Sequence, residues 1–407
     1  MVARSNSLRS RLPACLVGLA CAAVAGEVWG RVVRTEELPA GWVRPELVKL
    51  GWSSDEFRSF DTLPSEVERQ PGSFRLLALG DSFMSAGGIY RHHNRDVRWP
   101  HRFETYLEPR QSERLETRIL ATKGWGTQQQ LLAFLQRGAC WQPDLVVLCV
   151  CTNNDLLDIT AAIDARRARR PYFVASDGKL LGFAPDGQRL LLSGDRPERG
   201  PSAFIDLLQA RRWRSGRLAD WRLSTVDPRY TSWSGDLGED AVAGLLLPDR
   251  VAHEPQFSHD MLNAYIVESN EWLDYEWELE RLLIAELKRA VERAGAELVV
   301  LPLPMSLDPT DPTRLTGSGL VHTMETPAGP ITIDLDNPRR RLAAICEDLD
   351  LECWDIIDDF HAVASAPQAY ASIFPDANRH WSRAGHGLVA SLLAPRIAAR
   401  IDAAGGE

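Results

Sequence analysis

The sequence lacks the common signatures of nucleotide and metal sites. It contains no Gly-x-Gly-x-x-Gly run, no phosphate loop ending in Gly-Lys-Ser or Gly-Lys-Thr, no His-Glu-x-x-His motif and no Cys-x-x-Cys pair. His92 and His93 stand together in a polar stretch, which is typical of a solvated loop. We therefore expect neither a metal nor a cofactor.

A long run of basic residues is also missing. The chain has 407 residues, with 46 Lys and Arg against 56 Asp and Glu, and a net charge of −10 at pH 7. Phosphate backbones are bound by clustered positive charge, so this balance argues against a nucleic-acid partner. With 44% hydrophobic and 25% charged residues, the composition is that of an ordinary globular protein with a large core.

Cysteine is sparse, and its spacing does not indicate a disulfide framework. Two of the seven cysteines lie in an N-terminal apolar run. Cys149 and Cys151 alternate along a predicted strand, which is typical of buried apolar side chains. Cys346 and Cys353 could form a disulfide if the protein is exported.

The N-terminus has the pattern of a targeting segment. Residues 1–25 carry three arginines and no acid, then an apolar run, and end in Ala23-Val24-Ala25, which fits a signal-peptide cleavage site. An uncleaved anchor helix is the alternative, although the run is shorter than the roughly 20 residues that a membrane span needs. Either way we expect an exported protein, periplasmic or extracellular, with a possible N-terminal membrane anchor.

Five apolar segments have the pattern of buried strands, and helical patterns separate them. Their continuous apolar character predicts parallel strands covered on both faces; the segments are 74–81, 117–124, 144–152, 296–304 and 351–357. The alternation of strand and helix predicts an α/β fold, a doubly wound sandwich around a five-stranded parallel sheet.

A long insertion follows the third strand, at about 156–265. It is rich in Pro, Gly, Arg and Trp and far exceeds ordinary loop length, and the Ser-Asp-Gly at 176–178 predicts a hairpin within it. We interpret it as an insertion over the edge of the sheet rather than a separate domain. The chain then divides into the targeting segment, a lead-in at 26–70 and one domain at 71–407.

The first strand ends in Gly80-Asp81-Ser82-Phe83, which has two interpretations. Gly-Asp-Ser is good turn chemistry, and Asp81 or Ser82 could simply cap the next helix. The alternative is a nucleophile, because ligands of open α/β sheets bind outside the carboxyl ends of the strands. The other strand ends decide between these interpretations.

The ends of the second, third and fifth strands carry residues suited to acyl transfer. His380 can take the proton of the Ser82 hydroxyl, and a carboxylate such as Asp376 can orient its ring. The backbone N–H groups of Ser82 and Gly124 and the side-chain amide of Asn154 are donors for an oxyanion. Taken singly, each of these residues could be a turn, a cap or a surface residue.

Four motifs in this order resemble the SGNH/GDSL hydrolase family: Gly-Asp-Ser-Phe at 80–83, Lys-Gly-Trp-Gly-Thr-Gln at 123–128, Thr-Asn-Asn-Asp at 152–155 and His-Trp-Ser-Arg-Ala-Gly-His at 380–386. The resemblance covers about residues 50–400 and is to bacterial exported or membrane-anchored members. It implies a flavodoxin-like three-layer α/β/α sandwich and ester chemistry. By position it implies Ser82 as nucleophile, His380 as base, and Ser82, Gly124 and Asn154 as the oxyanion hole.

One position departs from the family pattern. The family's acid usually stands three residues before the histidine, where this chain has Ala377, whereas Asp376 stands four before. If the segment forms a helical turn, positions three and four apart share a face, so we expect the Asp376 carboxylate to reach His380 Nδ1. His386 is the rival base, but its Ala-Gly-His-Gly setting is typical of packing.

The substrate is indicated only broadly. Trp125 and Trp381 stand beside the proposed site, where their rings could flank a sugar or belong to the core. With export, they favour an O-acetyl ester of a cell-envelope or extracellular glycan, or another acylated small molecule. An O-acetyltransferase that modifies exopolysaccharide is the first alternative, and a catalytically decayed glycan-binding or assembly module is the second.

Overall fold

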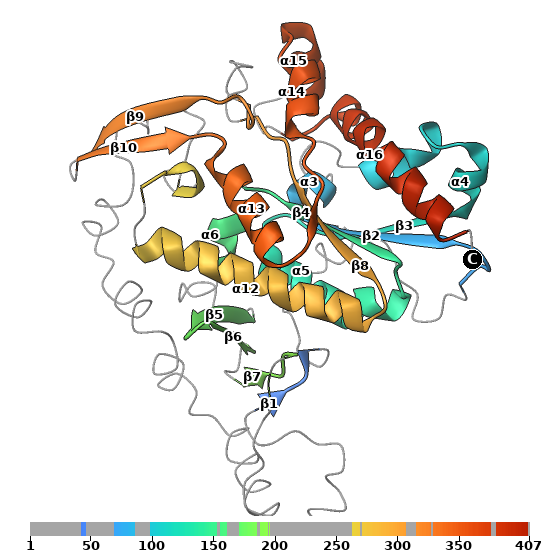
Figure 1. The fold of residues 1–407 in the computed structure, drawn as a ribbon, viewed down its shortest axis with the longest axis horizontal. Coiled ribbons are helices and arrows are strands. Elements are labelled where there is room, and N and C mark those ends of the chain that lie inside the picture. Colours follow the sequence, from blue (N-terminus) through green and yellow to red (C-terminus); the bar gives the residue numbers. More distant parts are fainter. Residues whose placement is uncertain are drawn as a thin grey trace, which may run out of the picture.

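The computed structural model describes residues 42–45, 69–85, 98–152, 155–160, 171–184, 188–193, 195, 263–268, 271–306, 315–326, 329–375 and 380–405. At its centre lies a sheet of five parallel strands (Figure 1): β2 (Phe74–Gly80), β3 (Leu115–Ala121), β4 (Leu145–Val150), β8 (Glu297–Pro302) and β11 (Glu352–Cys353).

The strands lie in the order β11-β8-β4-β2-β3, so β2 has the second strand on one side and the third on the other. This is the flavodoxin-like order of doubly wound sheets, in which ligands bind at the carboxyl ends where the order reverses. The expected fold class is confirmed. The fifth strand is shorter than its apolar run predicts, because Asp355 Oδ1 accepts the N–H of Ile357 at 3.0 Å, where α14 (Ile357–Ala364) begins.

Alternate residues of each strand point into two separate cores. Leu77 and Leu79 of β2 belong to a cluster with α5 (Thr127–Ala133), α12 (Glu271–Arg293) and α13 (Asn337–Asp348). Leu76 and Ala78 belong to a cluster on the opposite face, with α14, α15 (Pro367–Ile373) and α16 (Arg383–Ala403). Two buried faces explain why the strands read as continuous apolar runs.

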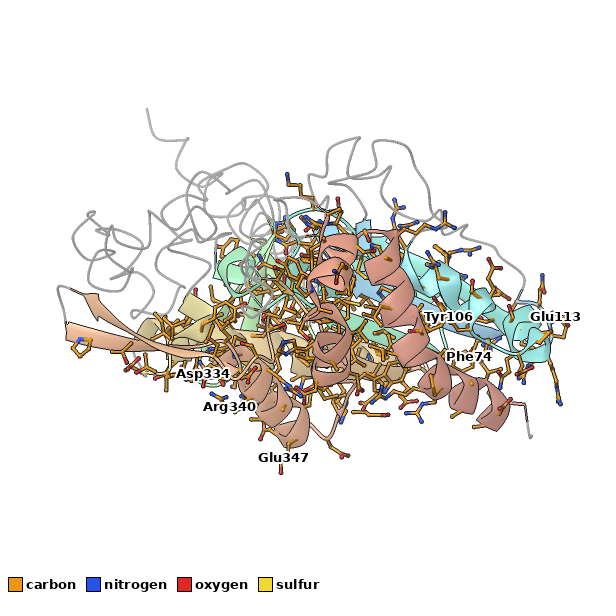
Figure 2. The ribbon with its side chains drawn as sticks, turned by 90° about the horizontal axis from the view of Figure 1, so that it is seen from above. Phe74, Tyr106, Glu113, Asp334, Arg340 and Glu347 are labelled. Atoms are coloured by element: carbon orange, nitrogen blue, oxygen red, sulfur yellow. The ribbon has the colours of Figure 1, made fainter. Side chains whose placement is uncertain are left out.

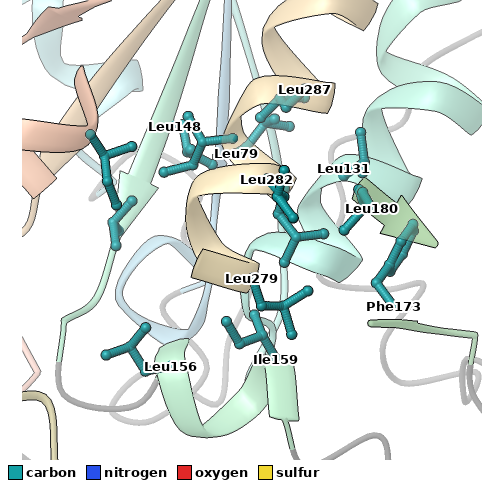
Figure 3. Close-up of a cluster of buried hydrophobic side chains, with 14 of the residues drawn as sticks. Leu79, Leu131, Leu148, Leu156, Ile159, Phe173, Leu180, Leu279, Leu282 and Leu287 are labelled. Atoms are coloured by element: carbon teal, nitrogen blue, oxygen red, sulfur yellow. The ribbon is translucent and has the colours of Figure 1, made fainter. Parts of the chain in front are cut away.

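A second, smaller sheet packs on α12. Its strands lie in the order β1 (Trp42–Val43), β7 (Arg189–Leu190), β6 (Lys179–Phe183) and β5 (Tyr172–Ser176). Figure 3 shows Phe173 and Leu180 of this sheet near Leu131 and Leu282, so α12 has apolar neighbours on both sides. The described part of the insertion therefore covers α12 rather than the edge of the central sheet.

The predicted hairpin in the insertion is confirmed. Ser176 pairs with Lys179, and the two turn residues Asp177 and Gly178 have φ values of 49° and 69°. Positive φ at both central residues is the signature of a type I′ turn, whose twist matches that of the flanking strands.

Short elements complete the described structure. They are α3 (Ser82–Ser85), η3 (Trp99–Thr105), α4 (Pro109–Arg114), η4 (Phe134–Gly138), η5 (Ala139–Trp141), α6 (Asp155–Thr160), η8 (Asn263–Tyr265) and the antiparallel pair β9 (Val321–Thr326) and β10 (Gly329–Asp334). Figure 2 shows Glu113 of α4 at one end of the molecule and Asp334 of β10 toward the other.

The prediction that two of the cysteines are buried apolar side chains is confirmed. Cys149 and Cys151 are fully buried. Cys346 and Cys353 are free thiols, and the neighbouring Cys353 together with burial raises the pKa of the Cys346 thiol.

Within the described ranges, no helix has both the length and the apolar character that a membrane span requires. Residues 1–41 lie outside those ranges. The signal peptide or anchor therefore stays a prediction, and so do the domain boundaries.

The buried Arg75 on β2 contacts residues of β3 and of the segment before β4. Arg75 is 1% exposed; its Nε is 3.1 Å from Glu116 Oε2, and one terminal nitrogen donates to the Trp141 carbonyl at 2.8 Å. Its guanidinium also lies 5.3 Å from the centre of the Trp141 ring. These contacts link β2, β3 and the segment before β4.

We expect Arg75→Leu to lower the free energy of unfolding by about 3 kcal/mol, because it leaves the half-buried Glu116 and the buried Trp141 carbonyl without this partner. The control is Arg400→Leu, which removes pairs with the exposed Glu297 and Glu352 and should cost less than about 1 kcal/mol. Urea denaturation measures both. Equal losses in the two variants would show that burial of Arg75 adds nothing.

Candidate active site

The turn after β2 presents Ser82 at the carboxyl edge of the sheet. Asp81 is fully buried, and its Oδ1 accepts the N–H of Phe83 at 2.9 Å. Its carbonyl accepts the N–H of Met84 at 3.2 Å. These bonds start α3 at once, and they leave the Ser82 side chain half-buried at the helix start.

Gly80 is required by space rather than by backbone conformation. A Cβ at this position would lie 2.3 Å from Met84 Cγ and 3.0 Å from Met84 Cβ. Met84 has no room to move, because it is fully buried and Trp99 Nε1 donates to its sulfur at 2.8 Å. A side chain at residue 80 would therefore push α3, and Ser82 with it, away from the strand end.

His380 comes from the other end of the domain. Trp381 is 2% exposed, and its Nε1 donates to the Pro304 carbonyl at 2.9 Å, which fixes the chain beside the histidine. Ser382 then caps α16 by accepting the N–H of Ala384 at 2.9 Å. The His380 ring lies 4.8 Å from the ring of Phe83.

The structure brings Ser82 and His380 together, although they are 298 residues apart. Ser82 Oγ lies 2.8 Å from His380 Nε2 and 3.3 Å from Asp81 Oδ2. A hydroxyl has one proton, so it can donate to only one of these acceptors at a time. The shorter distance to His380 is that of a good hydrogen bond, the arrangement in which a serine can lose its proton to a base.

The expected oxyanion residues are described in part. Gly124 adopts a φ of 70°, a left-handed conformation that glycine reaches without strain, and a Cβ there would meet no atom within 4 Å. Asn154 lies outside the described residues. The next residue, Asp155, is described, and its Oδ2 accepts the N–H of Cys151 at 2.8 Å.

Asp376 also lies outside the described residues, so its contact with His380 stays a prediction. The two tryptophans are described. Trp125 is fully buried and belongs to the core cluster of α12, and Trp381 packs edge-on against Phe83. Their burial argues against the expectation that their rings flank the substrate.

His386, the rival base, belongs to the core. It is 2% exposed and packs edge-on against Trp381, with 5.4 Å between ring centres. Burial lowers its pKa to about 3, and the charges of Arg98 and Arg102 and the His380 imidazole act in the same direction. A buried imidazole that stays neutral is a packing residue, as its sequence setting indicates.

Asp81, Cys151 and Asp155 form a buried cluster below Ser82, with their potential ligand atoms within 4.8 Å of one another. Both carboxylates already accept backbone N–H groups, and this bonding explains their positions. Burial and these two charges also raise the pKa of the neighbouring Cys149 thiol.

Sequence reasoning missed one buried contact near the site. Thr127, three residues after Gly124, donates its hydroxyl to Glu280 Oε1 at 2.6 Å, and both residues are buried. Burial raises the Glu280 pKa to about 7, while the bond from Thr127 lowers it. The sequence did contain a sign of this burial: Glu280 stands three residues before Leu283, so it falls on the apolar stripe of α12.

No family model matches the sequence, and the comparison with curated proteins found no match. Similar solved structures include a protein described as a GDSL-like lipase from Parabacteroides merdae, 10% identical over 80% of this chain and 96% of that chain, with a TM-score of 0.38. An acetylxylan esterase from Geobacillus stearothermophilus is 12% identical over 80% of this chain and 95% of its own, with a TM-score of 0.37. At such low identity and TM-score, function has to be inferred from this chain's own residues.

We expect Gly80→Ala to lower the free energy of unfolding by about 1–3 kcal/mol, as overpacking does, and to displace Ser82. The same change made in a Met84→Ala background should cost less, because the Cγ that a residue-80 Cβ would meet at 2.3 Å is gone. Urea denaturation of the four proteins measures the difference. Equal costs in both backgrounds would remove Met84 from the explanation.

We expect His386→Phe to preserve any reaction at Ser82 and to reduce acid sensitivity. The folded pKa of His386, about 3, lies below the unfolded value of about 6.5, so the unfolded state alone takes up the proton between these values. Stability from this residue is therefore present above pH 6.5 and is lost as pH falls. Urea denaturation between pH 7 and 4 should show a smaller loss in the variant; parallel curves would contradict the assignment.

Proposed function

We propose that the chain is a serine esterase of the SGNH type, with Ser82 as nucleophile and His380 as general base. The observation that carries the proposal is the distance of 2.8 Å between Ser82 Oγ and His380 Nε2 at the carboxyl edge of the sheet. The four ordered sequence motifs support it independently. The contact joins side chains 298 residues apart in a geometry suited to proton transfer, which favours an active site over a decayed one.

In the first half-reaction, Ser82 Oγ attacks the acyl carbon of an ester while His380 Nε2 takes the hydroxyl proton. The π electrons of the ester carbonyl move to its oxygen, which becomes an oxyanion. When the tetrahedral intermediate collapses, the bond to the alcohol oxygen breaks and His380 returns the proton to that oxygen. The alcohol leaves, and an acyl-Ser82 ester remains.

The second half-reaction repeats these steps with water. His380 takes a proton from the water as its oxygen attacks the acyl carbon, and the proton then passes to Ser82 Oγ when the acyl-enzyme bond breaks. The product is a carboxylic acid, and the serine is restored. A sugar hydroxyl in place of water would give acyl transfer instead.

Three donors are proposed to stabilise the oxyanion: the backbone N–H groups of Ser82 and Gly124 and the side-chain amide of Asn154. Loss of one such donor typically costs about 10²–10³ in kcat. We assign Asp376 the role of orienting His380 through Nδ1. The substrate we propose is an O-acyl ester, an acetyl ester of a cell-envelope or extracellular glycan, consistent with the expected export.

We expect Ser82→Ala to abolish both hydrolysis of p-nitrophenyl acetate and labelling by a fluorophosphonate probe. His380→Ala should lower kcat by about 10²–10⁴, the usual contribution of a general base. Circular dichroism checks that each variant folds. Ser112→Ala, on α4, is the matched control and should leave both readouts at the wild-type level.

Turnover by Ser82→Ala at the wild-type rate would remove this serine from the mechanism. A wild-type protein that neither labels nor hydrolyses the ester would favour the decayed module. Acyl transfer to an added glycan that exceeds hydrolysis would favour the transferase.

A further inference from the structure

Helix α12 packs against the two helices that follow Gly124 and Asn154, two of the three proposed oxyanion donors. It packs against α5, which begins three residues after Gly124, and against α6, which begins directly after Asn154. Figure 3 shows Leu282 of α12 near Leu131 of α5, and Leu279 near Ile159 of α6. A change in how α12 holds α5 is therefore transmitted to the loop before it.

One polar contact joins α12 to the start of α5. Glu280 is 1% exposed and Thr127 is fully buried, and the hydroxyl of Thr127 donates to Glu280 Oε1 at 2.6 Å. Within the described part of the chain, Glu280 Oε2 and the side-chain amide of Gln130 are buried without a hydrogen-bond partner. Gln130 lies three residues after Thr127, on the same face of α5.

A buried carboxyl with one hydrogen bond is costly for stability. The folded pKa of Glu280, about 7, lies above the unfolded value of about 4.3, so the folded state keeps the proton longer. By linkage, stability from this residue is present at low pH and is lost as pH rises from about 4 to about 7. A well-packed leucine would avoid that loss, and strongly perturbed groups of this kind are concentrated at functional sites.

We propose that Glu280 is a positioning residue, which holds the Gly124–Gly126 loop for oxyanion binding through the hydroxyl of Thr127. The proposal rests on the esterase function proposed above. It assigns Glu280 no contact with the substrate.

The loop is also held by contacts within its own layer. Trp125 is buried in the core, and Gly126 donates its N–H to Gln129 Oε1 at 2.9 Å. Gly124 itself, with its φ of 70°, has no side chain to hold it. The bond from Thr127 to Glu280 is a polar contact between the end of this loop and α12, beside the apolar packing of Trp125, and it is strongest when the acceptor is ionised.

The pH dependence of this contact follows from its surroundings. No residue of α5 is charged. The helix α12 and the elements packed against it carry these titratable or charged residues with described side chains near Glu280: Tyr275, Glu276, Glu278 and Arg281 on α12, Asp155 on α6, Tyr172 on β5, Lys179 on β6, Glu297 on β8, and Arg341 and Asp348 on α13, which pair with Asp274 and Arg281 of α12. Burial and the Thr127 bond account for the shift of Glu280.

The experiment compares Glu280→Gln, Thr127→Val and the double variant with wild type. Kinetics of p-nitrophenyl acetate hydrolysis and the rate of fluorophosphonate labelling are measured from pH 5.5 to 9. Glu280→Gln keeps the shape of the side chain and a neutral acceptor, so it imitates the protonated acid. Thr127→Ser keeps the hydroxyl and tests rescue.

The matched control is Glu286→Gln. Glu286 lies on the same helix and is equally buried, but it accepts from Ser193 N at 2.7 Å and pairs with Arg289 at 2.8 Å, away from α5. Any general effect of a buried glutamine on α12 appears in this variant. We expect it to leave kcat at the wild-type value.

We expect Glu280→Gln and Thr127→Val each to lower kcat about 10-fold at pH 8 with little change in KM, less than the loss of a whole donor. The double variant should be no worse than either single one, because both remove the same interaction. Thr127→Ser should keep most of kcat. The kcat of wild type divided by the kcat of Glu280→Gln should rise as pH rises through about 7. Effects of pH that both proteins share cancel in this ratio.

Wild-type kcat in folded Glu280→Gln, an equal loss in Glu286→Gln, or an effect on KM alone would each overturn the assignment. So would a ratio of kcat that stays constant with pH. If the wild-type protein neither labels nor hydrolyses esters, the esterase proposal fails, and the role of Glu280 fails with it. If the wild-type protein is labelled and the Glu280 and Thr127 variants are labelled at the same rate, only the role of Glu280 is overturned.

Discussion

The hydrogen bond between Ser82 Oγ and His380 Nε2 depends on nearly every other feature of the described structure. It joins two side chains 298 residues apart at a distance of 2.8 Å, which neither local turn could achieve alone. The parallel sheet brings the end of β2 to the edge where the strand order reverses, and the core on one face holds both α3 and α16 beside that edge. The missing side chain at Gly80 lets α3 pack close to the end of β2, and the buried Trp381 holds the chain beside His380.

Polar groups within the cores have a different task. Asp81 and Asp155 are buried acids that accept backbone N–H groups at the ends of β2 and β4, so each shapes a turn at the site. Glu280 differs from them, because it accepts the side-chain hydroxyl of Thr127 at 2.6 Å rather than a backbone N–H. Buried acids need such partners, because a carboxyl removed from water without a hydrogen bond costs several kcal/mol.

Two buried groups give the protein opposite responses to pH. His386 holds a low pKa in the fold and favours unfolding as pH falls, whereas Glu280 holds a high pKa and favours unfolding as pH rises through neutrality. Their contributions therefore oppose each other between about pH 4 and 7. The two groups lie on opposite faces of the sheet, since α16 and α12 belong to different cores.

The sequence by itself determined the five strand segments of the parallel sheet, the hairpin at Ser176–Lys179 and the candidate pair Ser82 and His380, because these follow from local apolar runs, turn chemistry and strand ends. Only the tertiary structure decided which neighbours those residues meet. Trp125 and Trp381 stand beside the site in sequence yet are buried in the core, and Glu280 is distant in sequence yet bonds to Thr127. Burial and long-range contact depend on what packs from elsewhere in the chain, and a local pattern of residues does not contain that information.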